Sequence, residues 1–286
     1  MYKIAILGCE NSHANAFLDL IMTDKIYPDI EVIGVYSEDL EAANKLNEKF
    51  GVYVAKSYDE FVGKVDGIVN TARHGDNHYK YLKPYIKSGI PMFVDKPITA
   101  SIEDAKAFKA ELIENKIKVS GGSSLKHPDG VAALKKVVAD KEYGTIYSGF
   151  ARAPVSLVND YGNFSFYSAH LIQMIGEVFG YFPNSVKAYV NGDVINCMIR
   201  YDEYDINTTY VVGNYKYYIG VNCENNVEIV ECTLDGCYKK EFDEFYNLLK
   251  GGNQPQSYDE FFAPVYIMNA IEHSMESGNE EIIERG

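Results

Sequence analysis

The sequence predicts an α/β protein in which a doubly wound parallel sheet is followed by an α+β domain with a large, mainly antiparallel sheet. Over residues 1–122, short apolar runs alternate with longer amphipathic segments, which is the rhythm of β-α-β units. After that, tyrosine and β-branched residues dominate the apolar runs, and turn-forming pairs separate them. The change of pattern predicts two domains, residues 1–122 and 123–286.

Five apolar runs are the predicted strands of the parallel sheet, and amphipathic segments between them are the predicted helices. The strands are expected at residues 3–7, 31–36, 65–70, 90–95 and 117–122. The helices are expected at 14–23, 39–50, 77–88 and 101–115. In the last of these, Ser101 is a candidate N-cap and Asp104 stands in the capping-box position. In a doubly wound sheet, a ligand is expected at the carboxyl ends of the strands.

For the second domain, the pattern predicts successive hairpins of one antiparallel sheet, with helices before and after it. Helices are expected at 128–139, 167–179 and 258–277, and strands at 185–190, 194–201, 207–212, 215–223 and 227–234. Pairs such as Asn191-Gly192 and Gly213-Asn214 separate the strands. One face of such a sheet needs a cover, which its own helices or a second copy of the chain can supply.

Composition restricts the class of partner. Among 286 residues, 41 acidic side chains outnumber 27 basic ones, for a net charge of −14. This charge repels nucleic acid and anionic membranes, so a small-molecule ligand is favoured. The sequence shows no signal-peptide pattern, no apolar stretch long enough for a membrane span, and five cysteines without a C-x-x-C pair. These features predict a cytoplasmic protein with reduced thiols.

The stretch "GCENSHANAF", residues 8–17, stands where a nucleotide-binding Rossmann domain has its glycine-rich turn G-x-G-x-x-G. Gly8 is the first glycine, but Glu10 and His13 occupy the other two glycine positions. At about 4 Å from a phosphate, a like charge costs roughly 4 kcal/mol at an effective dielectric constant of 20. Dinucleotide binding therefore requires that the side chain of Glu10 point away from the pyrophosphate.

Neighbouring residues supply donors for a dinucleotide. Asn11, Ser12 and His13 are candidate hydrogen-bond donors to phosphate, and Ser12 is a candidate N-cap of the first helix. At the end of the second strand, an acid is typical of NAD, and a serine followed by arginine is typical of NADP. This chain has Ser37 followed by two acids, which favours NAD without excluding NADP.

The segment "VDKPIT" carries a resemblance to a known family. Asp95-Lys96-Pro97 is similar to the Glu-Lys-Pro of the Gfo/Idh/MocA oxidoreductases, the family of glucose-fructose oxidoreductase and inositol dehydrogenase. The likeness extends over nearly the whole chain. It includes "NTARHGDNHYKYLKPYIKSGIPMFVDKP", then "EYGTIYSGFAR", a helix bearing His170, an antiparallel sheet and a late helix.

The resemblance implies an NAD(P)-dependent hydride transfer on a sugar, polyol or cyclitol-like substrate. Lys96 matches the family's catalytic lysine, and His170 matches a histidine that exchanges a proton with the substrate. Many active relatives have an aspartate four residues before that histidine, where this chain has Phe166. Tyr167 is a candidate replacement on the same helix, and Asp160 is another from the preceding loop.

Further candidates surround the same strand ends. The cofactor-binding set comprises Gly8, Glu10, Asn11, Ser12, His13, Ser37, Thr71, His78, Lys96 and Pro97. His78 is expected to line the nicotinamide end of the site or to cap the following helix. Arg73 is a candidate for binding an acidic substrate group, and the expected substrate-binding set is Arg73, Lys96 and His170. His74 and His78 are four residues apart but lack a third ligand, so no metal is expected.

Three functions share this fold. The first is an NAD(P)-dependent dehydrogenase. The second is a catalytically impaired regulatory relative that binds a nucleotide or a sugar, as the altered loop and Phe166 suggest. The third is a structural protein that uses the tyrosine-rich sheet for assembly. The resemblance implies a homo-oligomer, a dimer or tetramer, formed through the antiparallel sheet.

Overall fold

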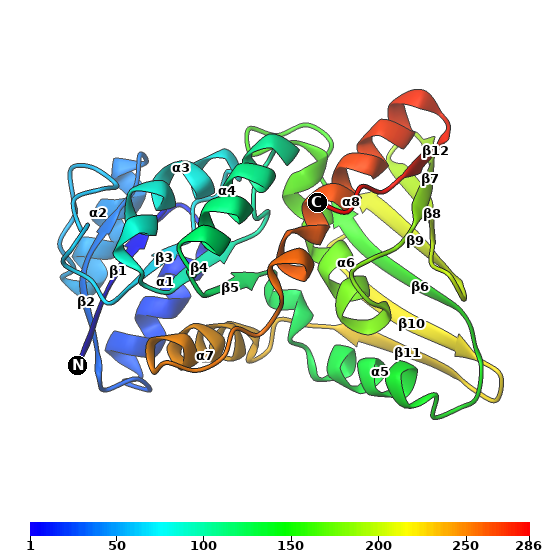
Figure 1. Ribbon diagram of the computed structural model, residues 1–286, viewed down its shortest axis with the longest axis horizontal. Helices are drawn as coiled ribbons and strands as arrows, with labels where there is room; N and C mark the ends of the chain where they lie inside the picture. The colour runs from blue at the N-terminus through cyan, green and yellow to red at the C-terminus, as the bar shows by residue number, and fades with distance from the viewer. The chain divides into compact units, whose positions relative to one another are not determined.

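The computed structural model describes all 286 residues, which form two compact units (Figure 1). The first unit consists of Met1–Gly122 and Tyr238–Tyr258, and the second of Ser123–Cys237 and Asp259–Gly286. The predicted division after residue 122 coincides with a limit between the units. Residues 238–258, however, fold with the first unit and correct the expectation that the whole of 123–286 belongs to the second.

The first unit is built on a five-stranded parallel sheet. Its strands have the order β2-β1-β3-β4-β5, and every pair of neighbours is parallel. The strands are β1 (Tyr2–Leu7), β2 (Ile30–Tyr36), β3 (Gly67–Asn70), β4 (Met92–Asp95) and β5 (Val119–Gly122). Because β2 and β3 flank β1 on opposite sides, the winding reverses next to β1. Ligands of doubly wound sheets bind at this kind of switch point.

Helices cover both faces of this sheet. Figure 1 shows α3 and α4 on one face and α1 with α7 on the other. The helix bounds are α1 (Ser12–Leu18), α2 (Leu40–Phe50), α3 (Asp76–Leu82), α4 (Ile102–Glu114) and α7 (Cys237–Leu249). As expected, the Ser101 side chain caps α4 by accepting from the backbone N–H of Asp104. The N-cap of α1 is Asn11 and not Ser12, because the Asn11 side chain accepts the N–H of Ser12.

Gly8 allows the strand ends at the switch point to approach closely. Its φ is +84°, and a Cβ at this position would lie 2.2 Å from the backbone nitrogen of Ala72. A larger residue therefore meets both an unfavourable backbone conformation and a backbone clash. The first glycine of the turn is thus required for the packing of the β1 and β3 ends.

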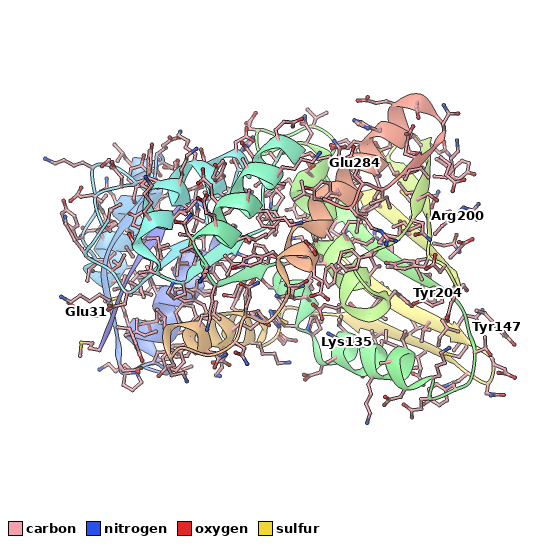
Figure 2. All side chains as sticks on the ribbon, in the orientation of Figure 1. Glu31, Lys135, Tyr147, Arg200, Tyr204 and Glu284 are labelled. Carbon is pink, nitrogen blue, oxygen red and sulfur yellow. The ribbon has the colours of Figure 1, made fainter.

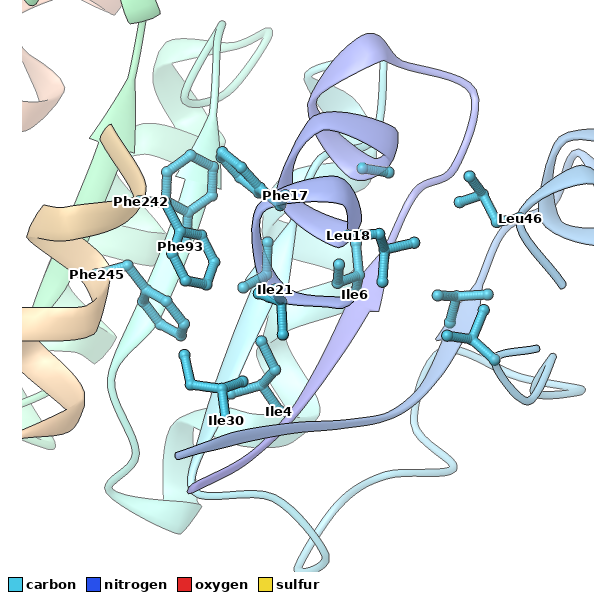
Figure 3. Close-up of a cluster of buried hydrophobic side chains, with 14 of the residues drawn as sticks. Ile4, Ile6, Phe17, Leu18, Ile21, Ile30, Leu46, Phe93, Phe242 and Phe245 are labelled. Atoms are coloured by element: carbon cyan, nitrogen blue, oxygen red, sulfur yellow. The ribbon is translucent and has the colours of Figure 1, made fainter. Parts of the chain in front are cut away.

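Helix α7, which the sequence pattern did not predict, packs on the first unit because its apolar side chains complete that core. Phe242 lies 5.0 Å from Phe17 of α1 between ring centroids, and Phe17 lies 5.1 Å from Phe93 of β4. Phe245 adds a further edge contact with Phe93. Figure 3 shows these rings together with the aliphatic side chains of β1, β2 and α1.

The second unit contains a seven-stranded mixed sheet in the order β11-β10-β6-β9-β8-β7-β12. The strands are β6 (Ile146–Val155), β7 (Ser185–Asn191), β8 (Val194–Arg200), β9 (Asp205–Val212), β10 (Tyr217–Cys223), β11 (Val227–Cys232) and β12 (Glu280–Ile282). The expectation of successive hairpins needs one correction, because β6 lies between β9 and β10 and pairs parallel with β9. Gly213-Asn214 therefore starts a crossing connection and not a hairpin.

Three helices belong to the second unit: α5 (Asp129–Asp140), α6 (Phe164–Phe179) and α8 (Tyr258–Ser277). Helix α6 is buried along most of its length and packs against β6, and α5 packs against α6 and β11. Lys135 of α5 forms an ion pair with Glu177 of α6 at 2.8 Å, and Arg200 binds carboxylates of β9 and β12. Figure 2 labels Lys135 and Arg200 among the side chains of this unit. None of the helices has the length and apolar character needed to cross a membrane.

Candidate active site

Lys96 follows β4 at the carboxyl edge of the parallel sheet, and only 4% of the residue is exposed. Burial lowers the pKa of its ammonium group to about 8, and the charge of Arg73 acts in the same direction against those of Asp95 and Glu241. Its backbone N–H donates to Oδ1 of Asp95 at 2.6 Å. A buried ammonium with this pKa can stabilise a developing alkoxide and exchange a proton near neutral pH.

Asp95 belongs to a buried network that joins three elements of the first unit. Its Oδ2 lies 3.1 Å from Nδ1 of His13, and Nε2 of His13 lies 3.2 Å from Oε2 of Glu241 on α7. Asn11 donates to the same Asp95 oxygen at 2.7 Å. Burial by itself lowers the pKa of His13, but the two carboxylates outweigh it and raise the pKa above its usual value.

This network corrects the expectation that the His13 ring donates to a phosphate. Both ring nitrogens face buried carboxylates, and 3% of the residue is exposed. The third glycine position of the turn faces the interior, where a glycine serves close packing of helix and strand. In this chain the imidazole of His13 fills that space and ties α1 to β4 and α7.

The carboxylate of Glu10 is held between the ends of three strands. Its Oε2 accepts from the backbone N–H of Cys9 at 2.8 Å and from Oγ of Ser37 at 2.7 Å. Its Oε1 accepts from the backbone N–H of Arg73 at 2.8 Å. The negative charge is therefore held by two backbone N–H groups and the Ser37 hydroxyl at the ends of β1, β2 and β3.

Two predicted cofactor residues have structural roles instead. Thr71 is fully buried and donates from Oγ1 to the carbonyl oxygen of Gly8 at 2.6 Å. His78 is also fully buried, with Nδ1 2.6 Å from the carbonyl oxygen of Pro97 and Nε2 2.8 Å from that of Ala72. Desolvation by burial lowers the pKa of His78. Its side chain does not cap α3, and it joins the turn that follows Lys96 to the end of β3.

The remaining predicted residues of the loop lie at its surface or support it. Ser12 is exposed, and its Oγ lies 3.1 Å from Oη of Tyr238. Ser37 is buried, and its hydroxyl donates to Glu10 and accepts the N–H of Asp39. Arg73 is half-buried, and its positive charge acts on Lys96.

In the second unit, His170 of α6 is oriented by Ser123, the first residue after β5. Nδ1 of His170 lies 2.6 Å from Oγ of Ser123, and this oxygen accepts the N–H of Leu125 at 3.1 Å. The Ser123 backbone N–H donates to Oε1 of Gln173, one turn after His170 on α6, at 2.7 Å. These contacts fix the orientation of the His170 ring.

Aromatic side chains surround His170. The rings of Tyr167 and Tyr217 have centroids 6.2 and 5.9 Å from the imidazole. Phe166 is buried and packs on the rings of Tyr161 and Tyr167, so no acid stands at the position one turn before His170. Asp160 lies exposed in the preceding loop.

The structure identifies four supporting residues that sequence reasoning missed. Asp95 had a signal, since it directly precedes Lys96-Pro97 and matches the glutamate of the family motif. Ser123 and Gln173 had none, because contacts between residues 50 positions apart leave no local pattern. Glu241 was missed because it lies on α7, a helix that was not predicted.

Comparison with sequence families finds a match within the parallel-sheet unit. Residues 2–123 match the model of an oxidoreductase family with an NAD-binding Rossmann fold. No curated protein matches the sequence. The matched segment contains the altered glycine turn, Lys96 and the strand that ends before Ser123.

Solved structures share the fold over almost the whole chain. Myo-inositol dehydrogenase from Lactobacillus casei, in complex with NAD(H) and myo-inositol, has a TM-score of 0.87 at 15% identity and covers 100% of this chain and 98% of its own. Myo-inositol 2-dehydrogenase from Lactobacillus plantarum gives 0.86 at 13%, with 99% of each chain covered. The WlbA dehydrogenase from Chromobacterium violaceum, with NADH and UDP-GlcNAcA, gives 0.81 at 16%, covering 100% and 96%. These low identities show the shared fold alone.

Proposed function

We propose that the chain is an NAD-dependent dehydrogenase or reductase of the Gfo/Idh/MocA type, acting on an alcohol group of a sugar, polyol or cyclitol, because residues 2–123 match the model of that oxidoreductase family with its NAD-binding Rossmann fold. The observation that carries this proposal is Lys96, a buried ammonium at the carboxyl edge of the parallel sheet with a pKa of about 8. The inositol dehydrogenases of the same fold support the substrate class.

The residues of the first unit fit a dinucleotide. Gly8 brings the β1 and β3 ends together, Glu10 turns its charge toward β2 and β3, and the exposed Ser12 offers a hydroxyl at the start of α1. Bound NAD supplies a hydride acceptor, which this chain's own side chains lack. Thr71, His13 and His78 support the site through contacts within the protein.

In the proposed mechanism, the Lys96 ammonium donates a hydrogen bond to the reacting oxygen of the substrate and stabilises negative charge that develops there. The imidazole of His170 takes the hydroxyl proton during oxidation and returns it during reduction. Ser123 is a positioning residue that fixes the ring of His170 through Nδ1. Arg73 is proposed to bind an acidic group when the substrate carries one.

Replacing Ser123 with alanine tests this positioning role. Loss of the Oγ contact is expected to lower kcat about tenfold, the effect of one hydrogen bond to a charged group, and to leave KM nearly unchanged. Ser123→Thr keeps a hydroxyl and should recover most of the rate. Equal losses in both variants, or a loss that appears in KM and not in kcat, would contradict the role.

Titration of the protein with NADH, followed by fluorescence, and assay of NAD reduction with a panel of cyclitols, polyols and sugars tests the proposed function. Saturable binding with turnover of at least one panel member is expected. Absence of saturable binding at millimolar cofactor would overturn the proposal.

One observation favours a second candidate, a regulatory relative that binds a nucleotide or a sugar without turnover. Phe166 stands one turn before His170, where active relatives commonly have an acid, and it is packed against two tyrosines. Tight NADH and sugar binding with no turnover of the panel is the result that would select this candidate.

We further propose that the protein is a homo-oligomer formed through the open face of its mixed sheet. The strand register aligns one row across this face: Ile229, Gly220, Phe150, Asn207, Met198 and Lys187. The neighbouring row, which includes Cys197 and Thr208, is buried. Ile229 is 57% exposed, so this row combines apolar and polar side chains at the surface as interfaces do.

Met198→Glu places a charge in the middle of that row. We expect the variant to remain folded but to dissociate to monomers in size-exclusion chromatography with light scattering. Val158→Glu, at a highly exposed loop position, is the matched control and should keep the wild-type mass. A wild-type protein that is monomeric at high concentration would contradict the oligomer proposal.

We place the protein in the cytoplasm on the basis of its thiols. None of the five cysteines forms a disulfide, and all are buried in the structure. Reduced, unpaired cysteines are typical of proteins in a reducing compartment.

A further inference from the structure

The end of β2 normally supplies the acid that accepts a hydrogen bond from the ribose of NAD. In this chain Ser37 stands there, and its hydroxyl already donates to Glu10 and accepts from the N–H of Asp39. Glu38 is paired with Lys80 at 3.0 Å. Asp39 caps α2 by accepting the N–H of Ala42. The three residues that follow the strand are therefore engaged elsewhere.

Glu10 brings a carboxylate to the same place from the glycine turn. Its Oε2 is 2.7 Å from Oγ of Ser37, so the acid group stands directly beside the end of β2. The backbone N–H groups of Cys9 and Arg73 fix its orientation. Cys9 and Ser37 use both acceptor positions of Oε2, whereas Oε1 receives one bond from Arg73 and keeps a second position.

We propose that Glu10 binds the 2′-hydroxyl of the adenosine ribose and thereby selects NAD over NADP. Its Oε1 accepts the ribose hydroxyl, in place of the acid that β2 lacks. A 2′-phosphate cannot donate such a bond and would meet the negative charge of the carboxylate. The glutamate in the second glycine position then takes the role of the acid that usually follows β2, and Ser37 holds it in place.

The inference depends on the proposed NAD-dependent function, and it competes with two other interpretations of Glu10. In one, Glu10 obstructs the pyrophosphate, as its place in the glycine turn suggests. In the other, it is only a brace that joins the ends of β1, β2 and β3. The three interpretations differ in how substitution changes the affinities for NADH and NADPH relative to each other.

The experiment measures the Kd of NADH and of NADPH by fluorescence titration for the wild type, Glu10→Gln, Glu10→Gly and Ser37→Ala. For ribose recognition, both Glu10 variants should bind NADH about 10- to 100-fold more weakly, the effect of losing a hydrogen bond to a charged acceptor. Their NADPH affinity should stay the same or rise. Ser37→Ala keeps the charge but loosens its support, so its preference should fall less. Circular dichroism verifies the fold of each variant.

The outcomes separate the interpretations. A fall of tenfold or more in the preference for NADH in both Glu10 variants supports the inference. Equal tightening of NADH and NADPH in Glu10→Gly indicates obstruction and overturns it. Equal weakening of both, or no change, indicates a brace and overturns it as well. If the wild type binds neither nucleotide, the NAD-dependent function itself fails, whatever the variants do.

Discussion

Replacing Lys96 with methionine is expected to lower kcat for alcohol oxidation by about 10²- to 10³-fold while NADH still binds. This factor is typical for the loss of one preorganised donor to a developing oxyanion. Methionine keeps much of the side-chain length in this buried position but removes the charge. Steady-state kinetics and NADH titration of the same preparation check the result. Unchanged turnover of an identified substrate would show that Lys96 has another role.

Lys96→Arg gives the matched control with a pH readout. The wild-type rate should fall as the pH rises through about 8, because the free-enzyme ammonium then loses its proton. A guanidinium stays charged above pH 12, so this basic limb should disappear in the arginine variant even though its rate is lower. A limb that stays near pH 8 in Lys96→Arg would belong to another group.

Replacing His13 with leucine is expected to destabilise the protein by about 3–5 kcal/mol, the cost of leaving a buried charge uncompensated. The imidazole lies between the buried carboxylates of Asp95 and Glu241 at 3.1 and 3.2 Å. Without it, two like charges remain in the interior. Urea unfolding followed by circular dichroism measures the change in the free energy of unfolding.

A second substitution tests whether charge is the cause. Glu241→Gln removes one of the two carboxylates, so the double variant His13→Leu/Glu241→Gln should be more stable than His13→Leu alone. If both variants lose the same stability, the role of His13 is packing and not charge compensation. A loss below about 1 kcal/mol in His13→Leu would contradict the charged network altogether.

Local pattern was sufficient for the parallel sheet and insufficient for parts of the second unit. Five short apolar runs have the length and composition of buried strands, and each is a strand in the structure. They end at Leu7, Tyr36, Asn70, Asp95 and Gly122. Strand β6, by contrast, was not among the predicted strands, and it inserts between β9 and β10. Such an insertion is decided by tertiary pairing, which sequence neighbours do not report.

Helix α7 shows the same limit for domain assignment. Its rings Phe242 and Phe245 pack on Phe17 and Phe93, contacts with residues more than 140 positions away that leave no local pattern. A division of the chain by position therefore assigned it to the wrong unit.

Motif position identified the main candidates of the site, but it did not give their partners. Lys96 was predicted from the Lys-Pro pair, whereas the network of Asp95 and Glu241 that acts on its pKa depends on distant contacts. Three side chains that were expected to face the cofactor point into the protein. Those of Thr71 and His78 contact backbone carbonyls, and that of His13 contacts carboxylates. For Glu10, the sequence left open whether its carboxylate would oppose a bound phosphate. Its contacts with Ser37 and Arg73 show which groups hold that carboxylate.

Transfer of deuterium from a carbon-deuterated cyclitol, polyol or sugar to NAD, followed by mass spectrometry, tests the central claim most directly. With wild-type protein and a panel of such alcohols, one deuterium should appear on the nicotinamide ring from at least one substrate. Lys96→Met should reduce the rate of this transfer by about 10²- to 10³-fold. Saturable NAD binding without label transfer from any member of the panel would contradict the assignment as a dehydrogenase of this substrate class.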